Sequence, residues 1–176
     1  MTVISRTPEN TNFLQPTKFL LTFERIPNVT YFCQEVNLPG IRLNSIEIPT
    51  PVLDYHVAGN KLTYGTFNIR FMVDEKLYSW KNIYNWFQSI GSPKGFDVRN
   101  RLAALQNANS ESKFTSYSDA ILTILNNLNN PIIRVHLAYL FPVSLSDIQF
   151  DTTLSADNII TADAEFMVEY FEFEEV

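Results

Sequence analysis

Residues 61–91 read KLTYGTFNIRFMVDEKLYSWKNIYNWFQSIG, and this stretch decides the fold. Its first half alternates, because Phe67, Ile69 and Phe71 fall on one face while Arg70 falls on the other. A period of two with a mostly apolar face is typical of a half-buried strand. We therefore expect a strand whose polar face is open to solvent.

The period changes to that of a helix after Asp74. Asp74 is a typical N-cap residue, Gly91 a typical C′ residue, and Pro93 follows shortly after. Apolar side chains recur between them at helical spacing, in a stripe of Leu77, Trp80, Tyr84 and Phe87 that Ile83, Trp86 and Ile90 widen. We expect the aromatic residues of this stripe to pack in the core. A strand that leads into such a helix predicts a sheet for the helix to cover.

The composition is that of a folded domain. With 176 residues and 45% hydrophobic residues, the chain is expected to form one domain over residues 1–176, preceded by a polar tail at residues 1–12. That tail has no basic start followed by an apolar run, so we expect no signal peptide. No apolar run approaches the ~18 residues of a membrane span. Cys33 is the only cysteine, which favours folding in the cytoplasm.

Charge is distributed unevenly along the chain, whose formal net charge is −6. Residues 136–176 contain nine acidic residues and no Lys or Arg, whereas residues 61–134 contain nine basic and five acidic residues. An acidic end would repel a phosphate backbone. The sequence therefore argues against sequence-specific binding of nucleic acid.

The remaining segments predict the other strands of the sheet. Residues 132–141 form a clear strand with Ile133, Val135, Leu137, Tyr139 and Phe141 on one face. Turn-forming residues at 126–131 favour a hairpin with residues 119–127, although that segment fits a helix or a strand by pattern alone. Further short strands or extended segments are predicted at residues 17–24, 28–36, 147–151 and 159–170.

Residues 38–60 are rich in proline and also apolar. Pro39, Pro49 and Pro51 argue against a long regular element, yet a solvent loop this apolar would be a liability. Two interpretations remain: a segment packed on its own domain, or a projecting arm that buries apolar residues on a neighbouring subunit. We favour the arm. The candidate inter-subunit residues are Ile41, Leu43, Ile46, Ile48, Val52, Leu53 and Tyr55.

A polar segment at residues 92–118 is predicted to be a surface insertion with a short helix at residues 98–108. It is either solvated surface or a contact for a protein partner. Its basic residues are Lys94, Arg99, Arg101 and Lys113.

Residues able to carry catalysis are scarce. His56, His136 and Cys33 have no spacing typical of a metal site, and no nucleophile or phosphate-loop motif is present. His136 is interpreted as a packed or interface residue. Residues 151–157 approach calcium-loop spacing, but Ala156 stands where the loop requires glycine, so we expect a turn. We predict no enzymatic activity, no cofactor and no metal.

The order of several features resembles the tail tube proteins of contractile-tailed bacteriophages over residues 13–173. The resemblance rests on the order and spacing of Phe13-Leu14-Gln15-Pro16, Leu38-Pro39, Ile48-Pro49, Val57-Ala58-Gly59, the helix with Trp86 and Gln88-Ser89-Ile90, Leu140-Phe141-Pro142 and residues 147–151.

The resemblance implies a mainly β fold, a two-sheet sandwich or small barrel flanked by one helix. It also implies hexameric rings that stack into a tube for DNA, with sheath and baseplate proteins as partners and the virion tail as location. Type VI secretion tube proteins look related. Residues 119–127 are then a strand. The insertion at residues 92–118 departs from the pattern, which leaves open a baseplate-proximal ring that starts the tube.

The acidic side chains Asp163, Glu165 and Glu169 share the polar face of the last predicted strand. They are expected either to line a channel to which DNA does not adhere or to meet solvent. From a different class of function, a small-ligand-binding β-barrel remains an alternative. A ligand carrier would be a small monomer or dimer, whereas a tube protein would form rings or filaments.

Overall fold

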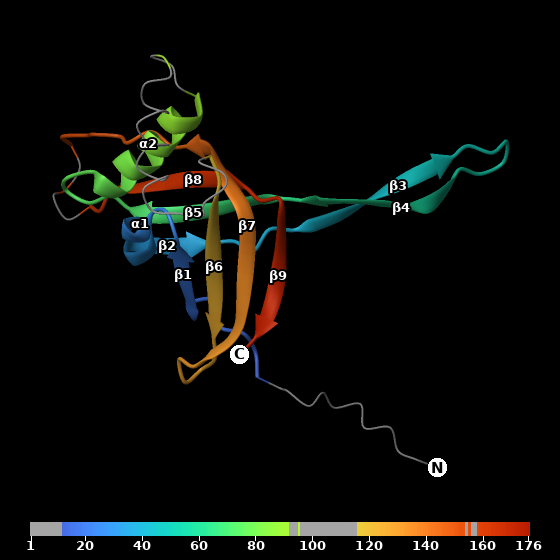
Figure 1. Ribbon diagram of the computed structural model, residues 1–176, viewed down its shortest axis with the longest axis horizontal. Helices are drawn as coiled ribbons and strands as arrows, with labels where there is room; N and C mark the ends of the chain where they lie inside the picture. Colours follow the sequence, from blue (N-terminus) through green and yellow to red (C-terminus); the bar gives the residue numbers. More distant parts are fainter. Residues whose placement is uncertain (1–11, 92–94, 96–115, 154, 156–157) are drawn as a thin grey trace, which may run out of the picture.

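The computed structural model describes residues 12–91, 95, 116–153, 155 and 158–176. Two layers of strands meet in the long strand β7, and a separate two-stranded hairpin extends from them (Figure 1). The elements are β1 (Phe19–Phe23), α1 (Pro27–Phe32), β2 (Cys33–Val36), β3 (Ile41–Ile48), β4 (Tyr55–Tyr64), β5 (Thr66–Met72), α2 (Tyr78–Gly91), β6 (Ser118–Leu125), β7 (Pro131–Leu145), β8 (Thr161–Met167) and β9 (Tyr170–Glu175). The mainly β, two-sheet fold predicted from the sequence is confirmed.

The strand β7 connects the two layers because it changes partners along its length. Its first part lies between β6 and β9, and its last part pairs with β8, which continues through β5 to the edge strand β2. Between these parts, Tyr139 has a φ of 54°, a backbone conformation uncommon for a bulky residue. The predicted alternation fails here: Leu137 and Leu140 are buried, whereas Tyr139 is exposed. The bend re-aims the strand from one layer into the other.

The core lies between the layers and under α2. Aromatic rings fill its centre. The ring centroid of Phe166 on β8 lies 5.4 Å from that of Phe23 and 5.7 Å from that of Trp86. The indole Nε1 of Trp86 donates a hydrogen bond to the carbonyl of Ser116 at 2.9 Å. The predicted sheet-covering helix is therefore confirmed, as is the strand assignment at residues 119–127, of which residues 119–125 belong to β6 in a hairpin with β7.

The Asp74 side chain caps α2, but the helix begins at Tyr78 and not directly after Asp74, because Leu77 has a φ of 57°. The Asp74 carboxylate accepts hydrogen bonds from the N–H groups of Tyr78 at 2.9 Å and Ser79 at 3.0 Å. The buried residues centre on Ile83 and Trp86, with serines at the contact. Tyr84 is 43% exposed, so the predicted stripe was wrong about it.

Residues 28–36 do not form the single strand that the sequence predicts. Residues 27–32 form α1, and only Cys33–Val36 forms β2. Pro27 occupies the start of α1, where its fixed φ favours a helix and its missing N–H costs nothing. Val29 is fully buried and anchors the turn to the core. The described residues therefore contain two helices, whereas the sequence predicted only one within this part of the chain.

Two further predictions on chain regularity were wrong. Residues 38–60 contain regular structure, because β3 and most of β4 form a hairpin there. The prolines do not oppose it: Pro39 precedes β3, while Pro49 and Pro51 lie in the turn. Residues 147–151 belong to no strand.

Several predictions fall outside the described part of the chain. These concern the tail at residues 1–11, the helix at residues 98–108, and the basic residues Lys94, Arg99, Arg101 and Lys113. Among the described residues, none of the helices combines the length and the hydropathy that crossing a bilayer requires.

Candidate functional site

The first candidate surface is the arm, which we define as the hairpin of β3, β4 and their connecting turn. It extends away from the layered body (Figure 1). Within the described residues, β3 and β4 pair only with each other. The projecting interpretation of residues 38–60 therefore describes the geometry, and packing on its own body does not.

Apolar side chains lie on the surface of the arm, and the body does not bury them. Cross-strand partners include Ile41 with Tyr64 and Leu43 with Leu62. At the turn, Val52 is 95% and Leu53 72% exposed. All seven candidate residues are exposed: Ile41, Leu43, Ile46, Ile48, Val52, Leu53 and Tyr55. Exposed apolar residues gathered on one hairpin are typical of an interaction site.

The arm is a defined structure with its own constraints. The Thr50 hydroxyl accepts a hydrogen bond from the Leu53 N–H at 3.2 Å and closes the turn. The register shifts between Leu43 and Ser45, and Gly59 faces Asn44 there. A Cβ on residue 59 would lie 2.6 Å from the Asn44 carbonyl oxygen, so this backbone approach requires glycine.

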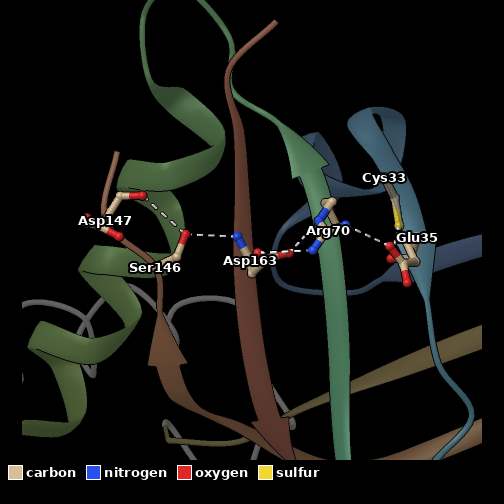
Figure 2. A network of polar contacts seen from close by, with 6 residues as sticks. All are labelled: Cys33, Glu35, Arg70, Ser146, Asp147 and Asp163. Atoms are coloured by element: carbon tan, nitrogen blue, oxygen red, sulfur yellow. Dashed lines mark hydrogen bonds and ion pairs between the residues drawn. The ribbon is translucent and has the colours of Figure 1, made fainter. Parts of the chain in front are cut away.

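The second candidate surface is the polar outer face of β2, β5 and β8. Figure 2 shows Arg70 of β5 between two carboxylates, with Nε donating to Asp163 Oδ1 at 2.8 Å and Nη1 to Glu35 Oε2 at 3.1 Å. The hydrogen bond and the charge of Asp163, together with the charge of Glu35, raise the pKa of Arg70. One cation thus links three strands and offsets part of the negative charge.

The side chain and the backbone of Ser146 hold the backbone of Asp163 from the other side. Ser146 Oγ accepts a hydrogen bond from the Asp163 N–H at 2.9 Å (Figure 2), and the Ser146 N–H donates to the Asp163 carbonyl at 2.8 Å. These bonds continue the β7–β8 pairing by one residue beyond β7.

The three predicted acidic residues are exposed but not equivalent. Asp163 and Glu165 lie on the outer face of β8, where Glu165 is opposite Asn68. Glu169 lies beyond the end of β8, and its N–H donates to the Ala138 carbonyl at 3.3 Å. The geometry brings Asp163 and Glu165 together on one strand and leaves Glu169 in the link to β9.

The distribution of charge along the sequence did not identify Arg70 as a functional residue of this face. The alternation of residues 61–73 places it on the polar face of its strand, opposite Phe67, Ile69 and Phe71, and the structure agrees. Its pairing with Asp163 depends on the register of β5 against β8, which sequence periodicity does not define.

The remaining polar candidates form no reactive arrangement. His136 Nε2 lies 2.8 Å from Glu174 Oε2 on the exposed face of β7 and β9, which makes it part of a surface pair. Burial raises the pKa of the Cys33 thiol to about 11, although a hydrogen bond to the Glu35 carbonyl opposes the shift. Across the residues that the structure describes, no group of three His, Cys, Asp or Glu side chains could hold a metal ion.

Residues 151–157 are described only in part. The Asp151 carboxylate accepts hydrogen bonds from the N–H and the hydroxyl of Thr153, at 2.8 and 2.7 Å. These bonds lower the pKa of Asp151 and form a local turn.

Comparison with known proteins gives one family and a consistent fold. The family model described as Phage tail tube protein matches residues 7–174. A comparison with individually curated proteins gave no significant match.

Solved structures of contractile injection systems contain chains of similar fold. The tube-terminating cap of the anti-feeding prophage has a TM-score of 0.60 at 12% identity, with both chains fully covered. The baseplate of the same particle contains a chain with a TM-score of 0.58 at 13% identity, covering 95% of this chain and 99% of that one. A sheath–tube complex of an extracellular contractile injection system, PVC, gives 0.57 at 15% identity, covering 94% of both. At these identities the likeness shows the fold alone.

Proposed function

Because this chain belongs to the phage tail tube protein family, we propose that it forms hexameric rings that stack into a tube for DNA delivery. The role is structural and needs no catalysis, cofactor or metal. Residues 1–176 act as one tube domain in the virion tail, after folding in the host cytoplasm.

The arm is the single observation that carries this proposal. Its exposed apolar residues gain nothing from their own body, because they lie on a separate two-stranded sheet. Burying them on identical copies removes apolar surface from water, which is favourable at roughly 25 cal/mol per Å². A contact between the arm of one copy and a different surface of the next is heterologous, so it generates closed rings or open filaments.

Assembly of the full chain tests the proposal. We expect rings or stacked tubes by negative-stain microscopy and a corresponding mass by light scattering. A variant in which a short turn replaces residues 43–55 is expected to remain soluble and not to stack. Its thermal unfolding should match that of the full chain, because residues 43–55 contribute nothing to the buried core. Normal stacking of the shortened variant would contradict the proposal.

The outer face with Asp163 and Glu165 is proposed to line the channel. Its carboxylates are exposed, and like charge keeps a phosphate backbone from adhering. In a Cys33→Ser background, Glu165→Cys in assembled tubes is expected to react with a small maleimide but not with one too bulky for the channel. Tyr31→Cys, at an exposed position on α1, is the control. Equal reaction of Glu165→Cys with both reagents would place this face outside the tube.

A second candidate function is the baseplate-proximal ring that starts the tube. The likeness to a chain in the anti-feeding prophage baseplate favours it. An initiator is expected to stop at single rings when purified, whereas a repeating tube protein should elongate. In either role we propose sheath and baseplate proteins as partners, since one similar chain comes from a sheath–tube complex.

The third candidate, a small-ligand carrier that binds between the layers, is disfavoured by the packing of the core. Large side chains such as Phe67, Phe166 and Trp86 fill the space between the layers. If light scattering showed the full chain to be a monomer at high concentration, this alternative would be favoured over the tube.

A further inference from the structure

One end of the layer formed by β1, β6, β7 and β9 extends beyond the rest of the body (Figure 1). The registers of these strands define rows of inward-facing side chains across the layer. The row of Phe23, Ala120, Leu137 and Phe171 is buried throughout. The next two rows toward the end of the layer lose this cover step by step.

The loss of cover follows the rows. In the second row Leu21, Leu122 and Val135 are buried, but Phe173 on β9 is 60% exposed. Phe173 meets Phe171 edge to face, with ring centroids 5.5 Å apart. The third row is only partly buried or exposed throughout: Phe19, Ile124, Ile133 and Glu175. We call Phe173 and this third row the open end.

The open end and the arm are two unpartnered apolar surfaces of the same chain. The hydrophobic cost of exposing each is removed at once if the arm of one copy covers the open end of the next. Contact between two different surfaces of identical chains is also the kind that propagates into rings or filaments. Because one contact covers both surfaces, a second copy is favoured over an unrelated partner as the occupant of the open end.

Charge favours one part of the arm. The open end contains the exposed carboxylate of Glu175, opposite Ile133. The half of the arm nearest the body carries Arg42 and Lys61 beside the Leu43–Leu62 pair. The outer half carries Glu47 and Asp54, which Glu175 would repel. The inner half therefore matches the open end in both apolarity and charge.

We propose that the open end is the receptor for the inner half of the arm of a neighbouring copy. This inference rests on the proposed self-assembly and names the surface that it uses. Phe173 inserts between the apolar residues of the arm, and Glu175 pairs with Arg42 or Lys61.

The first test compares Phe173→Ser with Tyr31→Ser in the full chain. Both remove an exposed aromatic ring, but Tyr31 lies on α1, away from the open end. We expect Phe173→Ser to lower the amount of sedimenting assembly at least tenfold, while Tyr31→Ser assembles like the wild type. Equal behaviour of the two variants, whether both assemble or both fail, would overturn the proposal.

Crosslinking tests the partner directly and does not depend on losing assembly. In a Cys33→Ser background, Leu43→Cys combined with Phe173→Cys is treated with a short bismaleimide after assembly. We expect a ladder of covalent multimers on a denaturing gel, and none for Leu43→Cys combined with Tyr31→Cys. Absence of the ladder from assembled protein would overturn the proposal.

The outcomes separate this inference from the proposed function. If the variant shortened at residues 43–55 fails to stack while Phe173→Ser stacks normally, the arm has another receptor and tube assembly stands. If both variants stack normally, the assembly role of the arm itself is wrong.

Discussion

Arg70 on β5 and Asp163 on β8 are directly opposed in the sheet, and Arg70 Nε donates a hydrogen bond to Asp163 Oδ1 at 2.8 Å. The same guanidinium reaches Glu35 on β2 at 3.1 Å. Arg70 therefore connects the short edge strand β2 to the two strands beside it. The side chains are about half exposed, so water and salt weaken the pairing.

Arg70→Met is expected to loosen β2 without unfolding the body. The backbone pairing of β2 with β5 covers only a few residues and contains a register shift, so the side-chain link matters locally. Amide hydrogens of residues 33–36 should exchange faster, while the global unfolding midpoint changes little. Arg42→Met on the arm is the control and should leave exchange in β2 unchanged. Unaltered exchange of β2 in Arg70→Met would show that the backbone ladder alone holds the edge.

Asp74→Ala is expected to destabilise the start of α2. Slight burial opposes ionisation of Asp74, but hydrogen bonds from the N–H groups of Ser79 and Tyr78 lower its pKa below the ordinary 3.8. Loss of such a cap costs about 1 kcal/mol. Urea unfolding at neutral pH measures the loss, with Glu75→Ala as the neighbouring control.

The same carboxylate predicts a pH dependence with a definite sign. Because the folded state lowers the pKa of Asp74, its stabilisation is complete above the ordinary value of 3.8 and is lost as pH falls through the lowered value. The difference between wild type and Asp74→Ala should therefore shrink in strong acid. A difference that stays constant down to that pH would assign the effect to something other than the ionised cap.

Trp86→Ala is expected to cost about 3–5 kcal/mol, the range for removing a large buried aromatic side chain. Trp86 is 1% exposed, contacts Phe166 and donates to the Ser116 carbonyl. Trp86→Phe should cost less, because it keeps an aromatic ring and loses the hydrogen bond. Tyr84→Ala, on the exposed side of the same helix, should change the unfolding free energy by less than about 1 kcal/mol. Similar losses for Trp86→Ala and Tyr84→Ala would mean that the helix is oriented differently.

The hydrophobic period of the sequence predicted the structure correctly where the residues of a single strand or helix determine it. Residues 66–72 form a strand with the predicted buried face, and Asp74 caps the helix. The period of α2 was also read correctly, and Ile83 and Trp86 are buried as expected, whereas Tyr84 and Ile90 of the same predicted stripe are exposed. Which part of the stripe is buried depends on strands distant in sequence, such as β8 with Phe166.

The features that the sequence did not reveal depend on distant contacts or on special backbone geometry. Tyr139 looks like one more inward residue of an alternating strand, but its positive φ redirects β7 between the layers. Residues 27–32 are short enough that burial of Val29 outweighs their strand-like composition. On the outer face, the acidic residues could be identified from the sequence. That Arg70 offsets the charge of Asp163 could not, because it depends on the register of β5 against β8.

Gly59→Ala is expected to damage the arm and leave the body intact. A Cβ at this position would lie 2.6 Å from the Asn44 carbonyl oxygen, and this oxygen belongs to the backbone, not to the end of a flexible side chain that could move aside. The two strands must separate or change register beyond this point, which displaces the apolar residues of the outer half of the arm. Because only Tyr64, at the base of the arm, packs against the buried core, the unfolding free energy should change by less than about 0.5 kcal/mol.

The matched control is Gly40→Ala at the base of the arm, where an added Cβ would meet nothing within 4 Å. Amide exchange over residues 41–64 should rise in Gly59→Ala alone, and sedimenting assembly should fall in the same variant. Both variants lose one glycine from the unfolded chain, so the difference between them isolates the contact with Asn44. If Gly59→Ala assembles as well as Gly40→Ala, the arm tolerates a changed register, and assembly depends on its apolar composition rather than on its pairing.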